Sequence, residues 1–80
     1  MQTIEIFDRI IIELAKAKAK HPIFPKDVIH MVAIMAEKSG EAVQAAIDRY
    51  YDPEIKDNEK LKTELLQTAA MCIRCLDNME

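Results

Sequence analysis

The 80-residue sequence has no tryptophan, one glycine, three prolines and only four phenylalanine and tyrosine residues. Together with the abundant Ala, Ile, Leu, Glu and Lys, this composition is typical of a packed helical protein. Half of the residues are hydrophobic and the formal net charge is only −3, a combination that argues against intrinsic disorder. We therefore expect one folded domain that covers residues 1–80.

The sequence also lacks a basic stripe of the kind that nonspecific nucleic-acid binding requires. Lys16, Lys18 and Lys20 come nearest, but steps of two residues spread their charges around a helix. No hydrophobic run approaches the roughly 20 residues that cross a bilayer. The opening "MQTIEIFDR" has acidic residues where a signal peptide carries basic ones. We therefore expect neither nucleic-acid polymer nor membrane as a partner, and a cytoplasmic location.

Cysteine is scarce, since only Cys72 and Cys75 occur, in the segment "MCIRC". In a protein that is not exported, both are expected to be reduced thiols. A structural zinc site needs four ligands, and no second pair of suitable spacing accompanies this one. Both cysteines are therefore interpreted as small core residues of an apolar helix.

Hydrophobic residues at helical spacing are abundant, and they fall into three segments. Prolines in "HPIFPKD" separate a first helix, Thr3–Lys20, from a second helix, which runs from Val28 to about Tyr51 with Asp27 as its N-cap. The third helix carries "EKLKTELLQTAAMCIRCLDNM" and begins either at Pro53 or after Asp57. The predicted fold class is all-α, with three helices per chain.

The hydrophobic surface of these helices is larger than one chain can cover. On the first helix we expect a buried stripe of Ile4, Phe7, Ile11 and Leu14, widened by Ile10. The second helix is apolar nearly all round at its beginning, and a helix that is hydrophobic on all sides must be buried on all sides. We therefore predict a homo-oligomer, dimer or tetramer, with a four-helix core built from the second and third helices of two chains.

Two carboxylates interrupt the apolar second helix in the segment "HMVAIMAEKSGEAVQAA". Glu37 and Glu41 share one stripe of that helix, and Glu64 of the third helix approaches them if the two helices pack antiparallel. Converging carboxylates repel one another unless a cation such as Mg²⁺ or Mn²⁺ lies among them. Gly40 costs about 1 kcal/mol relative to alanine in a helix, and it would let another helix or a ligand come close.

Ordinary ion pairs offer an alternative explanation of the same acids. Lys38 lies three residues from Glu41, while Lys60 and Lys62 neighbour Glu64. Solvated pairs of this kind contribute only a few tenths of a kcal/mol each. Spacing alone does not decide between ion pairs and a metal site.

The segment "AEKSGEAVQAA", followed in the third helix by "TELLQTAAMCI", resembles the MazG-like all-α nucleoside triphosphate pyrophosphohydrolases. In that family a Glu-Glu-x-Gly-Glu segment on one helix and a Glu-x-x-Asp segment on the next hold Mg²⁺. The metal binds the triphosphate and positions the water that splits NTP into NMP and pyrophosphate. Members are helical homo-oligomers, and the resemblance covers residues 27–78.

The resemblance implies that Glu37, Glu41 and Glu64 bind Mg²⁺ or Mn²⁺, with Gln67 assisting through its carbonyl oxygen. This sequence departs from the family pattern at two of the four acidic positions. Lys38 stands where the family has an acid, and Gln67 stands where it has aspartate. A lysine ammonium at that position would neutralise Glu41 and repel a metal ion, so the resemblance supports the fold more strongly than the activity.

Candidate substrate-binding residues are Lys38 for the phosphates and Phe24 and Tyr51 for stacking on a base. Three hypotheses follow. The first is an Mg²⁺-dependent nucleoside triphosphate pyrophosphohydrolase, impaired or altered in its substrate. The alternative is a non-catalytic helical oligomer that binds a nucleotide or a protein partner. A purely structural bundle of unrelated origin, with its acids exposed, is a third hypothesis.

Overall fold

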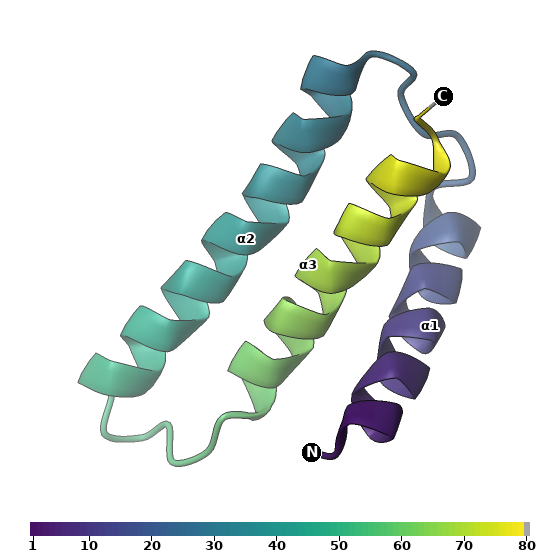
Figure 1. The fold of residues 1–80 in the computed structure, drawn as a ribbon. Coiled ribbons are helices and arrows are strands. Elements are labelled where there is room, and N and C mark those ends of the chain that lie inside the picture. Colours follow the sequence, from purple (N-terminus) through teal and green to yellow (C-terminus); the bar gives the residue numbers. More distant parts are fainter. Residues whose placement is uncertain (80) are drawn as a thin grey trace.

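The computed structural model describes residues 1–79, which form three α-helices and no strand (Figure 1). Helix α1 spans Thr3–Lys20, α2 spans Val28–Tyr51 and α3 spans Glu59–Asp77. The predicted all-α fold with three helices per chain is confirmed. Among the residues described, no helix has the length and apolar character needed to cross a membrane.

The helix boundaries follow from local sequence signals. The backbone N–H of His30 donates to Oδ2 of Asp27 at 3.2 Å, so Asp27 is the N-cap of α2 as predicted. Of the two predicted starts of α3, the later one is correct. Oδ1 of Asp57 accepts a hydrogen bond from the backbone N–H of Glu59 at 3.1 Å, at the residue where the helix begins.

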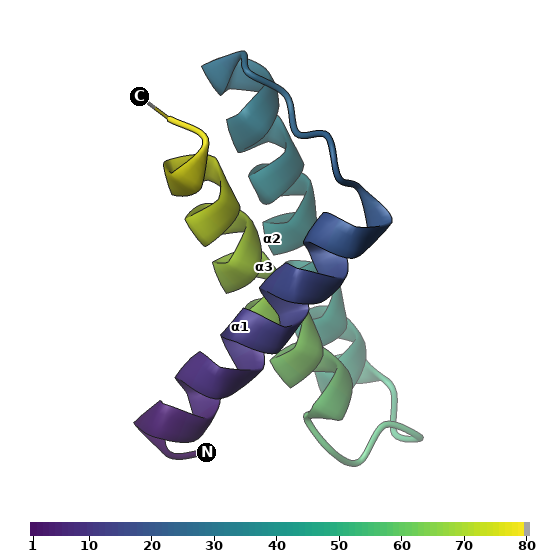
Figure 2. The same ribbon diagram turned by 90° about the vertical axis from the view of Figure 1, so that its right-hand side faces the viewer.

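Helix α3 lies between the other two helices, which do not pack against each other. It runs antiparallel to α2 (Figure 1), and α1 crosses it obliquely (Figure 2). The radius of gyration is 13.7 Å, whereas a compact domain of this length is expected to have one of about 12 Å. The three helices therefore form an open arrangement, in which α1 and α2 diverge.

The core consists of two layers, one on each side of α3. Between α1 and α3, the buried residues Ile10, Leu66 and Ala70 form the centre of an apolar cluster. Between α2 and α3 the buried residues are alanines, methionines and one cysteine, so small side chains alternate with flexible ones that fill irregular gaps. They are Met31, Ala42, Ala45, Met71 and Cys75.

The buried face of α1 differs from the predicted one. Ile4, Phe7 and Ile11 are exposed, by 70%, 58% and 62%, and only Leu14 of that stripe packs on the core. Helix α3 instead contacts the side of α1 that carries Ile10, which lies about 100° around the helix from Ile11. The stripe therefore remains uncovered within one chain.

Candidate functional site

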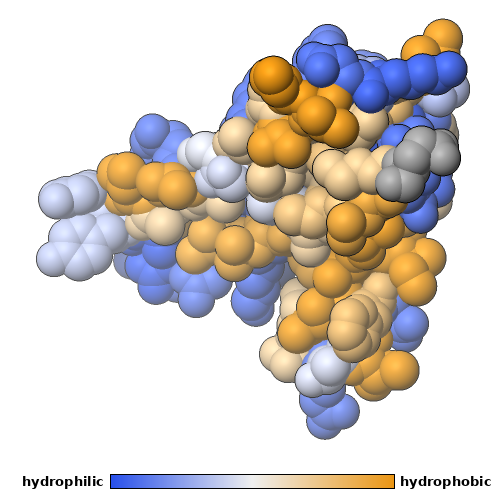
Figure 3. Space-filling view, turned by 45° about the horizontal axis from the view of Figure 1, so that its top comes forward, coloured by the Kyte–Doolittle hydropathy of each residue, from blue (hydrophilic) through white to orange (hydrophobic). Residues whose placement is uncertain are grey.

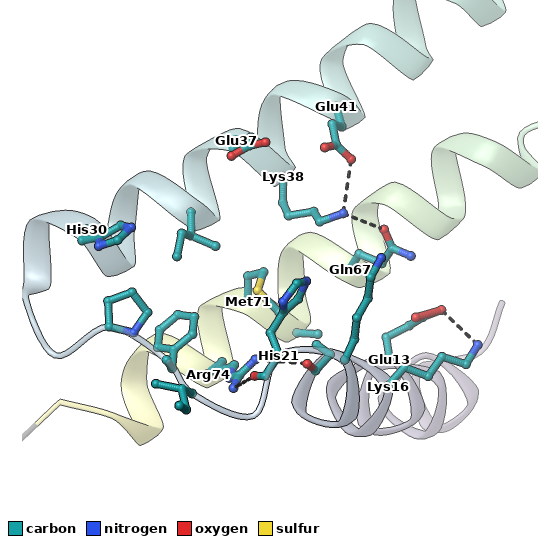
Figure 4. Close-up of a pocket in the computed structure, with 17 residues that line it drawn as sticks. Glu13, Lys16, His21, His30, Glu37, Lys38, Glu41, Gln67, Met71 and Arg74 are labelled. Atoms are coloured by element: carbon teal, nitrogen blue, oxygen red, sulfur yellow. Dashed lines mark hydrogen bonds and ion pairs between the residues drawn. The ribbon is translucent and has the colours of Figure 1, made fainter.

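Lys38 occupies the centre of a polar cluster between α2 and α3. Its Nζ lies 3.3 Å from Oε2 of Glu41 on its own helix and 3.3 Å from Oε1 of Gln67 on α3 (Figure 4). Lys38 reaches Gln67 because it stands on the face of α2 that packs against α3, in line with the buried Ala42 and Ala45. A lysine ammonium thus bridges two of the four side chains that the sequence predicts as metal ligands.

The ammonium of Lys38 affects the pKa of the Glu41 carboxyl. Its pKa lies below the ordinary value of 4.5, first because Lys38 donates a hydrogen bond to the carboxylate and second because of a side-chain contact with Glu64. The charges of Lys38 and Lys60 lower the pKa further, whereas partial desolvation opposes them. Glu41 is therefore a carboxylate at neutral pH, and its negative charge is balanced by Lys38.

Glu64 is buried, with 7% of its surface exposed. Its Oε1 lies 3.6 Å from Nζ of Lys60, one turn earlier on α3. Its Oε2 is buried and has no hydrogen-bond partner. The two ion pairs that the sequence offers as an alternative to a metal site, Lys38 with Glu41 and Lys60 with Glu64, are thus both present, but one carboxylate oxygen of Glu64 is left without a partner.

Glu37 is exposed and lies one turn before Glu41 on the same side of α2 (Figure 4). Within residues 1–79 no three His, Cys, Asp or Glu side chains come close enough together to hold a metal ion. Gly40 does not make room for another element of this chain, since a Cβ added there would meet nothing within 4 Å. The structure therefore brings Glu41, Glu64 and Gln67 to one region around Lys38, with Glu37 at its margin.

A cavity of 630 Å³ opens beside this cluster, between the second half of α1, the connection from α1 to α2, and the facing sides of α2 and α3 (Figure 4). The volume is within the range of small-molecule pockets. The apolar part of the lining includes Phe24, Ile34 and Met71. The charged part combines basic and acidic side chains, namely Lys16, Lys20, Lys38, Arg74, Glu13, Glu37 and Glu41.

Arg74 builds one wall of the cavity and is a residue that the sequence reasoning missed. It is 4% exposed, and its guanidinium donates hydrogen bonds to the backbone carbonyls of Ala17, at 3.2 Å, and His21. The guanidinium carbon also lies 4.7 Å from the ring centroid of Phe24. Arg74 thus satisfies carbonyls at the C-terminal end of α1. Its one sequence signal is that it is the only charged residue inside "MCIRCL".

Two of the three predicted substrate-binding residues line the cavity, and one does not. Phe24 and Lys38 face it from the connection and from α2. Tyr51 lies outside it, at the end of α2, where its ring packs edge to face against Tyr50 with centroids 4.8 Å apart. A base bound in the cavity could therefore contact Phe24, whereas Tyr51 is remote from it.

The two cysteines differ in their surroundings. Cys75 is buried as expected, and its Sγ donates to the backbone carbonyl of Met31 at 3.4 Å. Burial, followed by the nearby Cys72, raises the pKa of the Cys75 thiol, which keeps it protonated and unreactive. Cys72 is exposed within the single chain, contrary to the expectation of a core residue. The reason is that its side of α3 is covered by neither α1 nor α2.

Comparison with known proteins does not assign the chain, since no family model, no curated protein and no solved structure matches it.

Proposed function

We propose that the protein is a metal-independent nucleotide-binding protein with a MazG-like helical fold, in which an ammonium group stands in the position of the family's metal ion. The observation that supports this proposal is the position of Lys38. Its Nζ is within 3.3 Å of both Glu41 and Gln67, two of the four side chains that the resemblance assigns to Mg²⁺. The chain would then bind its ligand without hydrolysing it.

As arranged, this set of side chains does not suit a divalent cation. Mg²⁺ prefers about six oxygen ligands at 2.0–2.1 Å, and Lys38 already takes one oxygen each from Glu41 and Gln67. A positive ammonium at that position also repels a second cation. Glu64 shares its charge with Lys60, which leaves Glu37 as the one carboxylate of the predicted set without an ion pair in residues 1–79.

The cavity has an apolar surface that suits a base and lysine side chains that suit phosphate groups. Phe24, Ile34 and Met71 supply an apolar surface for a base. Lys20 lines the cavity from the end of α1 and forms no ion pair among residues 1–79, so its ammonium is free to meet a phosphate. Lys38 supplies a second cation, in place of the charge that a metal ion brings to the triphosphate in the family.

The orphaned oxygen of Glu64 favours a second candidate function, an Mg²⁺-dependent nucleoside triphosphate pyrophosphohydrolase. Leaving a buried carboxylate oxygen without a partner costs free energy, and metal coordination is one way to recover it. This alternative requires the Lys38 side chain to swing out of the cluster, so that Glu41 and Gln67 become free to bind the metal. We rank it second because both hydrogen bonds of Lys38 would be lost.

We also propose that the chain acts as a homo-oligomer with a four-helix core formed by α2 and α3 of two chains. Among residues 1–79, sixteen large hydrophobic residues are exposed, and all of them except Met1 and Met79 belong to the three helices or to the first connection. A soluble protein seldom leaves so much apolar surface in water. The open arrangement of the three helices leaves room for a second copy beside α2 and α3.

Calorimetric titration with ATP and UTP in the presence of EDTA tests metal-independent binding. We expect binding that is unchanged when Mg²⁺ replaces EDTA, and no release of pyrophosphate in either buffer. Lys38→Met should weaken binding at least about tenfold, because it removes a charge-assisted contact to phosphate. Lys26→Met is the matched control, since Lys26 is an exposed lysine of the same region that does not line the cavity.

Two results would overturn this proposal. If no nucleotide binds in either buffer, the proposal that the protein binds nucleotides is wrong. Binding that needs Mg²⁺ and releases pyrophosphate, with loss of both in Glu41→Gln, would establish the second candidate instead.

A further inference from the structure

We infer that Arg74 and Lys20 bind a phosphate group at the end of the cavity where α1 meets its connection to α2. The resemblance assigns no role to Arg74. On α3 it stands seven positions after Gln67, the partner of Lys38, which is about 10 Å along a helix axis. The subsite is therefore separate from the cluster around Lys38. It suits any phosphomonoester, so the inference goes beyond the nucleotide of the proposed function and does not depend on it.

Arg74 is a buried cation without a carboxylate partner. It is 4% exposed, and no ion pair formed within residues 1–79 includes it. Asp77 stands one turn later on α3, yet its Oδ2 pairs with Nζ of Lys18 at 3.6 Å. Glu13, which also lines the cavity, pairs with Lys16 at 3.7 Å. Because a buried charge without a counter-ion costs free energy, we expect Arg74 to take its counter-ion from a ligand.

The groups that surround Arg74 compensate only part of its charge. The carbonyls of Ala17 and His21 each accept a hydrogen bond from it, and the C-terminal end of a helix carries about half a negative charge. The ring of Phe24 adds a cation–π contact. Lys20 brings a second positive charge to the same end of α1 and forms no ion pair within residues 1–79. This end of the cavity therefore keeps a net positive charge, which attracts an anion.

The guanidinium of Arg74 also has hydrogen-bond donors left for a ligand. Of its five N–H groups, two donate to the carbonyls, through Nη1 and Nη2. Nε has no partner within residues 1–79 and is still accessible, since Oε2 of Glu64 is the one buried side-chain N or O atom there without a partner. Arg74 lines the cavity (Figure 4). A guanidinium binds phosphate oxygens through two parallel hydrogen bonds, and a phosphate dianion matches the two charges of Arg74 and Lys20.

Apolar side chains border the subsite. Figure 3 turns the end of the molecule that carries the connection toward the viewer and shows hydrophilic and hydrophobic side chains next to each other. Phe24 and Ile23 of the connection line the cavity together with Arg74. A phosphate group attached to a small organic body could place that body against these side chains. The ligand class is therefore a phosphomonoester, whose phosphate group has the same chemistry as free inorganic phosphate.

NMR of the arginine Nε–H signals tests the subsite directly. The chain has three arginines, and each signal is followed while inorganic phosphate is added in EDTA at constant ionic strength. We expect the Arg74 signal to shift until the site is saturated. Arg49 is the matched control, because it also donates to two backbone carbonyls, those of Ile55 and Lys56, but does not line the cavity. Its signal should stay in place.

Variants of the two cations test their separate contributions. Lys20→Met should raise the phosphate dissociation constant about threefold, because an exposed cation is partly screened by solvent. Lys26→Met should leave it unchanged, since Lys26 is exposed and does not line the cavity. Arg74→Lys keeps the charge but loses the planar fork, so binding should weaken at least about tenfold. If Arg74→Lys does not fold, the wild-type signals and Lys20→Met still decide the question.

Phenyl phosphate distinguishes the two sources of the phosphate group. If it binds at least about threefold more tightly than inorganic phosphate, and Phe24→Ala removes that advantage, the ligand is an organic phosphomonoester. Equal binding of the two compounds identifies inorganic phosphate itself as sufficient.

An Arg74 signal that moves with neither compound would overturn the inference, as would an Arg49 signal that moves equally. Lys20→Met binding as tightly as the wild type would contradict the role of Lys20. Inorganic phosphate has no base, so the subsite can be confirmed where nucleotide binding in EDTA fails. A nucleotide can likewise bind through Lys38 while the Arg74 signal does not respond to phosphate. The two proposals are therefore refuted by different measurements.

Discussion

The position of the Lys38 ammonium decides whether the polar cluster between α2 and α3 is an ion-paired cluster or a metal site. From the sequence, Glu64 was expected to approach Glu37 and Glu41 if α2 and α3 pack antiparallel, and ion pairs with Lys38 and Lys60 were the alternative explanation of these acids. The sequence alone could not decide between them, because the outcome depends on where the long, flexible side chain of Lys38 points. In the folded chain its ammonium lies between Glu41 and Gln67, two positions brought together only by the antiparallel packing of α2 and α3.

The carboxyl of Glu41 provides a direct measure of this cluster. Since its pKa is lowered in the folded chain, Glu41 contributes stability above its ordinary pKa of 4.5, and this contribution is lost as the pH falls through the lowered value. In Lys38→Met the pKa should return toward 4.5, and the stability should depend less on pH in that acidic range. An NMR titration of the Glu41 side chain measures the shift.

Lys60→Met is the matched control for this titration, because the charge of Lys60 is the smallest of the causes that lower the pKa of Glu41. It should move the pKa less than Lys38→Met does. A Glu41 pKa that is the same in the wild type and in Lys38→Met would refute the hydrogen bond between them.

At the scale of the elements, the helix boundaries could be predicted well from the sequence, whereas the side of each helix that is buried could be predicted less well. Boundaries at the prolines and at Asp27 were predictable because capping and φ restriction act between near neighbours. The buried side of α1 was not, since both Ile10 and Ile11 lie on apolar stripes and only the position of α3 selects one. The role of Arg74 could not be predicted either, because its partner Ala17 is 57 positions away and only the packing of α1 on α3 brings the two together.

Gly40 lies within helix α2, and no contact within residues 1–79 requires a glycine at that position. An added Cβ would meet no atom within 4 Å, and alanine favours the helical conformation by about 0.8–1 kcal/mol relative to glycine. Gly40→Ala should therefore raise the free energy of unfolding by roughly that amount in a urea titration. The reciprocal change Ala33→Gly, at another exposed position of α2, should lower it similarly. A destabilised Gly40→Ala would mean that a ligand or a second copy approaches the helix at this point.

At the scale of the whole molecule, the divergence of α1 and α2 from a central α3 explains two features together. On one side it leaves the 630 Å³ cavity beside Lys38, and it also leaves large apolar side chains of α2 and α3 exposed, among them Val43 and Leu65. Sequence reasoning predicted that one chain could not bury its hydrophobic surface. It could not predict the cavity, which depends on the crossing of α1 over α3 and on the anchoring of the connection by Arg74.

The central claim is that Lys38 takes the position that a metal ion has in the MazG-like family, and calorimetric titration with Mn²⁺ tests it most directly. We predict no heat of specific binding for the natural protein. We predict clear binding by the double variant Lys38→Glu with Gln67→Asp, which removes the ammonium and restores both carboxylates. Specific Mn²⁺ binding by the natural protein that disappears in Glu41→Gln would contradict the account.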